Sequence, residues 1–186
     1  PVVDADGMGR AFPEFQMKTF FVYGVPYAPM TIADEKGNVA IIPKAITSKW
    51  VERIARSITI QMGSVACYAL APMTAAQVRN TAVKDSLTLS KSLGDSVRNA
   101  NKTKSDPINA MLEVNPGKVL YEGKISGLQR KTTQGFARGE VTVDGSGAFA
   151  GTVMTIEFQN ENLIARIGNE VVCVVPDLIS IVDSER

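Results

Sequence analysis

The expected fold of the first half of the chain rests on residues 3–14, which read Val3-Asp4-Ala5-Asp6-Gly7-Met8-Gly9-Arg10-Ala11-Phe12-Pro13-Glu14. A short β-branched and acidic run precedes a glycine turn, and Pro13 suits the first position of a helix, where its missing N–H costs nothing. The pattern predicts a strand, a tight turn and a helix over residues 13–21 that ends near Gly24.

Helical and strand-like segments continue to alternate up to about residue 116, which is typical of an α/β domain. Helices are predicted where apolar residues recur every three or four positions behind a capping hydroxyl, and strands where short apolar runs meet turn residues. The expected elements are a hairpin of residues 30–33 and 39–42, a helix over 48–62 capped by Thr47, a buried central strand within 64–71, a short helix from Thr74 to about 82 and a helix over 85–99.

From Lys118 onward the chain consists of short β-branched runs that Gly or Asn turns separate. Regular short strands with turn signals predict a sandwich or a barrel. We therefore expect an α/β domain of residues 1–116 followed by a β-barrel-like domain of residues 117–186. Because the chain begins with Pro1 rather than Met and ends in a strand-like run, we expect a fragment in which both domains are incomplete.

Composition excludes several classes of function. The formal net charge of the 186 residues is +1 and the basic residues are interspersed with acidic ones, so neither nucleic acid nor an anionic membrane surface is an expected partner. No apolar run reaches the roughly 20 residues that span a bilayer, and no signal-peptide pattern starts the chain. We expect a cytoplasmic protein whose two cysteines, Cys67 and Cys173, are buried and reduced.

The absence of histidine limits the available chemistry further. Ser-His-Asp and Cys-His catalysis and imidazole-based zinc sites are excluded within this chain. Catalysis would have to use carboxylates, Lys or Arg, hydroxyls, thiols or backbone groups.

The glycine turn near the start of the chain is the best candidate for a functional site. Asp4 or Asp6 is placed to act as a base, Arg10 to pair with a planar polar group, and Glu14 lies in the first turn of the expected helix. The two aspartates alternate along a strand, so only one of them is expected to face a site. The remaining candidates, which would bring backbone N–H groups close to a ligand, are Gly7, Met8 and Gly9.

Two simpler interpretations of this turn stay open. Asp6 would cap the turn, the glycines would satisfy unusual dihedral angles, and Glu14 would only stabilise a helix start. The carboxylates would also suit a hard cation such as Mg²⁺, but such sites need more oxygen ligands than the turn supplies. We therefore predict no cofactor and no metal site, with a bound metal ion as the alternative.

The string Val2–Glu14 closely resembles the signature of a bacterial family, long catalogued as a domain of unknown function, that includes the S-methyl-thiohydantoin desulfurases. Genes of this family often accompany those of hydantoinases and oxoprolinases. Residues 117–125 and 175–179 extend the resemblance over most of the chain. It implies a three-layer α/β sandwich domain, of which residues 1–116 are the C-terminal portion, joined to a β-barrel-like domain. Family members are considerably longer than this chain.

The resemblance implies a hydrolase that removes a thiol from a small cyclic amide such as an S-methyl-thiohydantoin or another hydantoin derivative. The hypothesis is that Asp4 or Asp6 activates water, that the backbone of residues 7–9 stabilises the developing charge, and that Arg10 holds the polar edge of the ring. Glu14 would support them. The alternative is a non-catalytic metabolite-binding, regulatory or assembly module, and a third possibility is a structural subunit. A homo-oligomer is expected from the base rate for such proteins.

Overall fold

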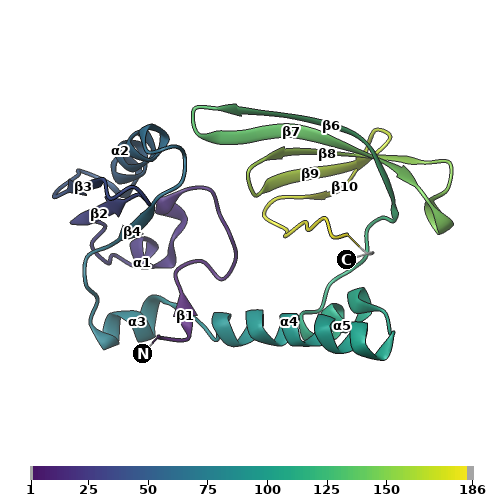
Figure 1. Cartoon of the computed structure of the whole chain (residues 1–186), viewed down its shortest axis with the longest axis horizontal. Helices are drawn as coiled ribbons and strands as arrows, with labels where there is room; N and C mark the ends of the chain where they lie inside the picture. The colour runs from purple at the N-terminus through teal and green to yellow at the C-terminus, as the bar shows by residue number, and fades with distance from the viewer. Residues whose placement is uncertain (1, 184–186) are drawn as a thin grey trace. The chain divides into compact units, whose positions relative to one another are not determined.

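The computed structural model describes residues 2–183 (Figure 1). The chain divides into two compact units. The α/β unit comprises residues 5–84 and 132–136, and the sheet unit comprises residues 2–4, 85–131 and 137–183. The boundary expected near residue 116 separates two domains that would fold independently. A division into compact units does not test independent folding, so this boundary stays a prediction.

The core of the α/β unit joins a three-stranded antiparallel sheet to one helix. These elements are β2 (Met30–Ala33), β3 (Val39–Ile42), β4 (Cys67–Ala69) and α2 (Ser48–Gln61), with the strand order β3-β2-β4. Met30 and Ile32 alternate along β2 and are buried against Val51 and Ala55 of α2. Thr47 caps α2 by accepting a hydrogen bond from the Trp50 amide. The predicted hairpin and the predicted helix are both confirmed.

The helix predicted over residues 13–21 is wrong, because two short elements replace it. They are the 3-10 helix η1 (Phe15–Met17) and α1 (Thr19–Val22), and Lys18 between them has an extended backbone. The helix breaks because Thr19 donates both its amide and its hydroxyl to the carbonyl oxygen of Gly7, at 2.7 and 3.2 Å. This bond ties the glycine turn to the segment that carries Lys18.

The α/β unit also contains a short pair of strands and a further helix. The two-residue strand β1 (Ala5–Asp6) pairs antiparallel with β5 (Val83–Lys84). Thr74 is the N-cap of helix α3 (Ala75–Thr81), as predicted, and a capping box with Gln77 satisfies the backbone amides of both residues.

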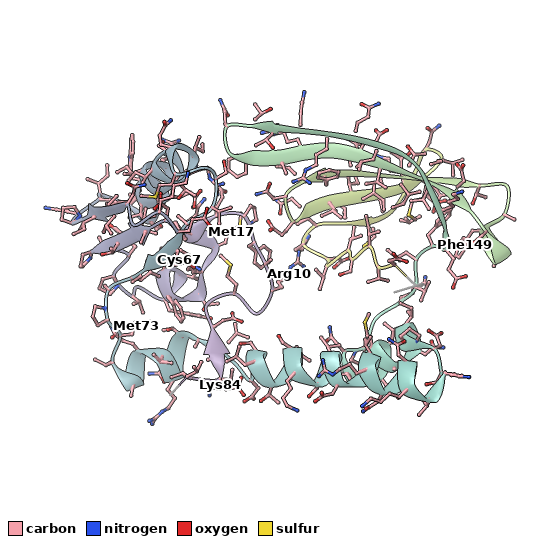
Figure 2. The ribbon with its side chains drawn as sticks, in the orientation of Figure 1. Arg10, Met17, Cys67, Met73, Lys84 and Phe149 are labelled. Atoms are coloured by element: carbon pink, nitrogen blue, oxygen red, sulfur yellow. The ribbon has the colours of Figure 1, made fainter. Side chains whose placement is uncertain are left out.

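The buried central strand predicted within residues 64–71 is wrong. Strand β4 is shorter, lies at the edge of its sheet, and is exposed along its length. Cys67, which lies on this strand and is labelled in Figure 2, is exposed. The expectation of a buried thiol is therefore wrong for Cys67, and Cys173 is half-buried.

The sheet unit consists of a helix pair and an antiparallel meander. Its sheet has the order β10-β9-β8-β7-β6, and its core contains Val141, Val143, Met154, Ile156 and Ala165. The elements are α4 (Ser86–Thr103), α5 (Pro107–Val114), β6 (Gly123–Thr133), β7 (Phe136–Gly145), η2 (Gly147–Phe149), β8 (Val153–Gln159), β9 (Asn162–Ile167) and β10 (Glu170–Val174), with the tip of the β6–β7 hairpin assigned to the α/β unit.

The barrel-like form expected for residues 117–186 is corrected by this topology. Within residues 2–183 the sheet is open, because β6 and β10 lie at its opposite edges and do not pair with each other. The fold is thus mixed α/β with several separate sheets, and the three-layer α/β sandwich stays a prediction. None of the helices in residues 2–183 is long and apolar enough to cross a membrane.

Candidate functional site

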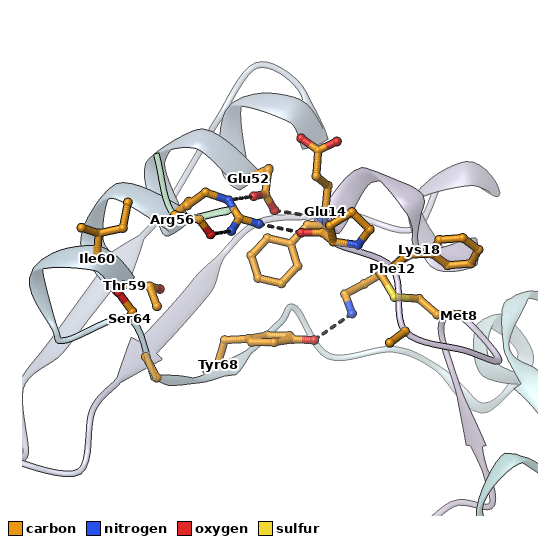
Figure 3. A pocket seen from close by; sticks show the side chains of 15 residues that line it. Met8, Phe12, Glu14, Lys18, Glu52, Arg56, Thr59, Ile60, Ser64 and Tyr68 are labelled. Atoms are coloured by element: carbon orange, nitrogen blue, oxygen red, sulfur yellow. Dashed lines mark hydrogen bonds and ion pairs between the residues drawn. The ribbon is translucent and has the colours of Figure 1, made fainter. Parts of the chain in front are cut away.

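A cavity of about 380 Å³ opens in the α/β unit (Figure 3). This volume lies within the range of roughly 300 to 1,000 Å³ that small-molecule sites occupy. Its wall includes Met8 of the glycine turn and charged or aromatic side chains from the segment that follows the turn, from α2 and from β4. The residues used below are Met8, Glu14, Lys18, Glu52, Arg56 and Tyr68.

Lys18 is a buried cation in this wall. Its side chain belongs to a residue that is only 9% exposed, and its Nζ donates a hydrogen bond to Tyr68 Oη at 2.7 Å. The ammonium also lies 5.5 Å from the ring centre of Phe15 and 5.1 Å from that of Tyr68. No carboxylate of the described residues forms an ion pair with Lys18. The Tyr68 hydroxyl oxygen and, farther away, the two aromatic faces therefore supply the negative potential around the ammonium.

Glu52 and Arg56, in contrast to Lys18, form an ion pair with each other. Glu52 is 4% exposed, and its Oε1 pairs with Arg56 Nε at 2.5 Å while its Oε2 accepts the Phe15 amide at 2.9 Å. Arg56 donates further to the carbonyl oxygens of Pro13 at 2.6 Å and Gly135 at 2.9 Å. One turn of α2 places both side chains on one face, so this pair fixes the cavity wall.

Asp6 organises the glycine turn from within. Its Oδ1 accepts hydrogen bonds from the amides of Met8 at 2.6 Å and Gly9 at 2.5 Å. Gly9 has a φ of +72°, and a Cβ on Gly7 would lie 2.7 Å from a ring carbon of Phe20. The amides of Met8 and Gly9, which we expected to face a ligand, thus already donate to the Asp6 carboxylate.

Glu14 and Arg10 lie on the segment that leaves the turn. Glu14 lines the cavity, and its carboxylate makes no hydrogen bond or ion pair with another residue of the range 2–183. Figure 3 shows its side chain pointing away from Lys18. The guanidinium carbon of Arg10 lies 4.5 Å from the ring centre of Phe12, which stacks the cation on that ring.

Asp4 belongs to the sheet unit, where it caps α4. Its carboxylate accepts hydrogen bonds from the Thr88 hydroxyl, from the Thr88 amide at 3.1 Å and from the Leu87 amide at 2.9 Å. The hydroxyl of Thr88, followed by the backbone amides, holds the pKa of Asp4 below its ordinary value. The two aspartates of the turn are thus assigned to different units.

The predicted site residues therefore fall into four sets. Met8 and Glu14 line the cavity, Asp6, Gly7 and Gly9 shape the turn beside it, Arg10 stacks on Phe12, and Asp4 caps a helix of the sheet unit. Residues 2–183 contain no group of three or more Cys, Asp or Glu side chains placed to hold a metal ion. The expected independence from metals and cofactors stays a prediction.

Sequence reasoning missed the most deeply buried charges of the cavity wall, Lys18 and Glu52. For Glu52 a signal existed, because it follows Val51 on the buried stripe of α2 and has Arg56 four residues later. For Lys18 no local signal exists, since Tyr68 lies 50 residues away in the sequence.

The fold and the site define a mixed α/β protein with an antiparallel meander and a cavity of small-molecule size. Models of S-Me-THD-like proteins match the chain along its length: the N-terminal domain model covers residues 1–44 and the C-terminal domain model covers residues 46–186. The chain therefore belongs to the S-Me-THD-like family. The predicted resemblance to the S-methyl-thiohydantoin desulfurase-like family is thereby confirmed.

A solved structure shares this fold. The X-ray crystal structure of a protein from Chromobacterium violaceum, a target of the Northeast Structural Genomics Consortium, superposes with a TM-score of 0.68 and 26% sequence identity. The match covers 95% of this chain and 48% of that protein, so the chain spans about half the length of its solved relative. No curated protein matches this chain.

Proposed function

We propose that this chain contributes the substrate cavity of a hydrolase that acts on a small cyclic amide, such as an S-methyl-thiohydantoin or another hydantoin derivative. The observation that carries the proposal is the cavity of about 380 Å³ beside the glycine turn, with a buried lysine in its wall. Membership of the S-Me-THD-like family supports the class of substrate. A planar five-membered ring fits comfortably within such a volume.

Glu14 is the residue that we propose for water activation. It lines the cavity, and its carboxylate has no bonded partner among residues 2–183, whereas the carboxylate of Glu52 is engaged by Arg56 and by the Phe15 amide. Its side chain points away from Lys18 in the structure (Figure 3), so water activation requires a change of its rotamer. The activated water would attack the ring carbon that bears sulfur, the C–S bond would break, and the thiol would leave with a proton while a ring carbonyl forms.

Asp6 and its neighbours then have a supporting function. Because Asp6 holds the amides of Met8 and Gly9, it keeps the loop in the shape that places Met8 in the cavity wall. Arg10 remains the proposed contact for a polar edge of the ring. Asp4 is a weaker candidate for catalysis, because its oxygens are engaged by the first turn of α4.

A second candidate function is a metabolite-binding module that does not turn its ligand over. One specific observation favours it: the backbone amides best placed to stabilise a developing anion at the turn are already bonded to Asp6. In that case the cavity would bind the ring, and no thiol would be released.

The test is thiol release from an S-methyl-thiohydantoin, followed with a colorimetric thiol reagent, by the purified protein and its Glu14→Gln variant. We expect the variant to lose about 100-fold or more in kcat, as general-base variants do. Glu35→Gln is the matched control, because Glu35 is an exposed glutamate on the β2–β3 turn. Ring binding without thiol release by the parent protein would favour the binding module instead.

A further inference from the structure

We infer that Lys18 and Tyr68 form an anion-binding pair, so that the cavity takes its cyclic ligand in a negatively charged form. This inference rests on the proposed function for the identity of the ring, but the preference for negative charge rests on Lys18 alone. The ligand class is a cyclic imide whose ring nitrogen has lost its proton, with the charge shared by the adjacent carbonyl oxygens.

Lys18 carries a buried positive charge without a matching negative charge among the described residues. Lys18 is 9% exposed and has no carboxylate ion pair within residues 2–183. Burying a cation without a counter-charge is costly, and the faces of Phe15 and Tyr68 offset only part of that cost. An anion in the cavity would supply the missing charge.

The ammonium group of Lys18 has hydrogen-bond donors that residues 2–183 do not use. An ammonium group has three N–H donors, and Lys18 uses one of them on Tyr68 Oη. The other two make no hydrogen bond with a residue of the described range. The Tyr68 hydroxyl accepts from Lys18, so its own proton is available to a ligand. Together the pair offers several donors at one point of the wall.

Arg56, the other cation of the wall, differs from Lys18 in that the protein engages its charge. Arg56 is paired with Glu52 and donates to two carbonyl oxygens, so its charge and its donors are engaged by the protein. Lys18 is thus the cation of the wall whose remaining N–H groups can donate hydrogen bonds to a ligand. It lies on the segment that Thr19 ties to Gly7, which holds its backbone in place.

The proposed ligand can carry this negative charge. In a hydantoin ring one N–H lies between two carbonyl groups, and its loss spreads negative charge over the carbonyl oxygens. Charge-assisted hydrogen bonds from an ammonium to such oxygens are roughly twice as strong as neutral ones. A ring methylated on that nitrogen cannot form the anion and provides a matched neutral probe.

The test is isothermal titration of the purified protein with hydantoin and with its N3-methyl derivative, from about pH 6 to about pH 9. We expect hydantoin affinity to rise about tenfold over this range as the ring ionises, and the affinity of the N3-methyl ring to stay constant. Lys18→Met should abolish the rise, and Lys44→Met, which removes an exposed lysine, should leave it intact. Equal pH profiles for the two rings, or an unchanged rise in Lys18→Met, would overturn the inference.

A second variant keeps the test decisive if Lys18→Met fails to fold. Tyr68→Phe retains the ring that contacts Phe15 and removes the hydroxyl, so it should weaken hydantoin binding several-fold at high pH. Tyr23→Phe, at a tyrosine that is 68% exposed, is its control. Equal hydantoin affinities of Tyr68→Phe and Tyr23→Phe would overturn the inference.

Thiol release separates the inference from the proposed function. Lys18-dependent hydantoin binding without thiol release would support the anion-binding pair and contradict the hydrolase. Thiol release with no Lys18-dependent binding would support the hydrolase and overturn the pair, and absence of both would overturn both.

Discussion

The glycine turn (residues 6–9) and the part of the cavity wall around Lys18 and Tyr68 lie in the same unit, but their charged groups differ in how far the protein itself engages them. In the turn, the Asp6 carboxylate holds the amides of Met8 and Gly9, so its polar atoms face the chain itself. In the wall, Lys18 has one hydrogen bond, to Tyr68, and no ion pair within residues 2–183. We therefore propose that the turn shapes the cavity and that the wall around Lys18 binds the ligand.

The largest expected effect on stability comes from the buried carboxylate of the cavity wall, that of Glu52. Glu52→Ala should lower the free energy of unfolding by about 3 kcal/mol, because it leaves the Phe15 amide and the Arg56 guanidinium without their buried partner. Chemical denaturation would measure it. Glu35→Ala, at an exposed glutamate, should change stability by less than about 0.5 kcal/mol, and a similar loss in both variants would contradict this role for Glu52.

A glycine pair tests whether the turn is packed as a frame. Gly9→Ala should destabilise the protein by about 2 kcal/mol and Gly24→Ala by about 1 kcal/mol, because both glycines have positive φ angles but only Gly9 faces a close neighbour. A Cβ on Gly9 would lie 3.0 Å from a Val83 methyl, whereas Gly24 has open space. Thermal unfolding compares the two, and equal losses would show that Val83 does not confine the turn.

The role of the Asp6 carboxylate in the turn can be tested with one variant that removes only its charge and another that also removes its oxygen atoms. Asp6→Asn keeps an oxygen acceptor for the amides of Met8 and Gly9, and Asp6→Ala removes it. We expect Asp6→Ala to be about 1 kcal/mol less stable than Asp6→Asn in thermal unfolding. If the two variants are equally stable, Asp6 does not hold the turn.

The smallest expected effect concerns Asp4 and depends on pH. Its folded pKa is lowered by the hydrogen bonds from Thr88 and Leu87, so its stabilisation is present above its ordinary pKa of 3.8 and is lost as the pH falls through the lowered value. Asp4→Asn should therefore lower the melting temperature by a few degrees at neutral pH, with the gap closing in acid. A difference in melting temperature that does not narrow in acid would contradict this role of the Asp4 carboxylate.

Local patterns predicted the elements whose stability is local. Thr47 and Thr74 cap the helices that the sequence assigned to them, and the hairpin of β2 and β3 has its expected charged turn. Helix α5 is not among the elements expected from the sequence, although Asp106 caps it and Pro107 begins it.

The cavity wall could not be predicted, because it depends on contacts between distant segments. The burial of Lys18 requires the break between η1 and α1, which the Thr19–Gly7 hydrogen bonds impose, and Tyr68 from another strand. For the same reason β4 was misjudged: its apolar sequence suggested a central strand, but strand order decides which strand lies at an edge.

The most direct test of the account compares Lys18→Met with Asp6→Asn in thiol release from an S-methyl-thiohydantoin. The account predicts that Asp6→Asn, which keeps the turn, retains most of the parent activity, while Lys18→Met loses about tenfold or more in kcat/KM, mainly through a higher KM. Loss of release in Asp6→Asn, with Lys18→Met as active as the parent, would contradict it and make the turn itself the catalytic site.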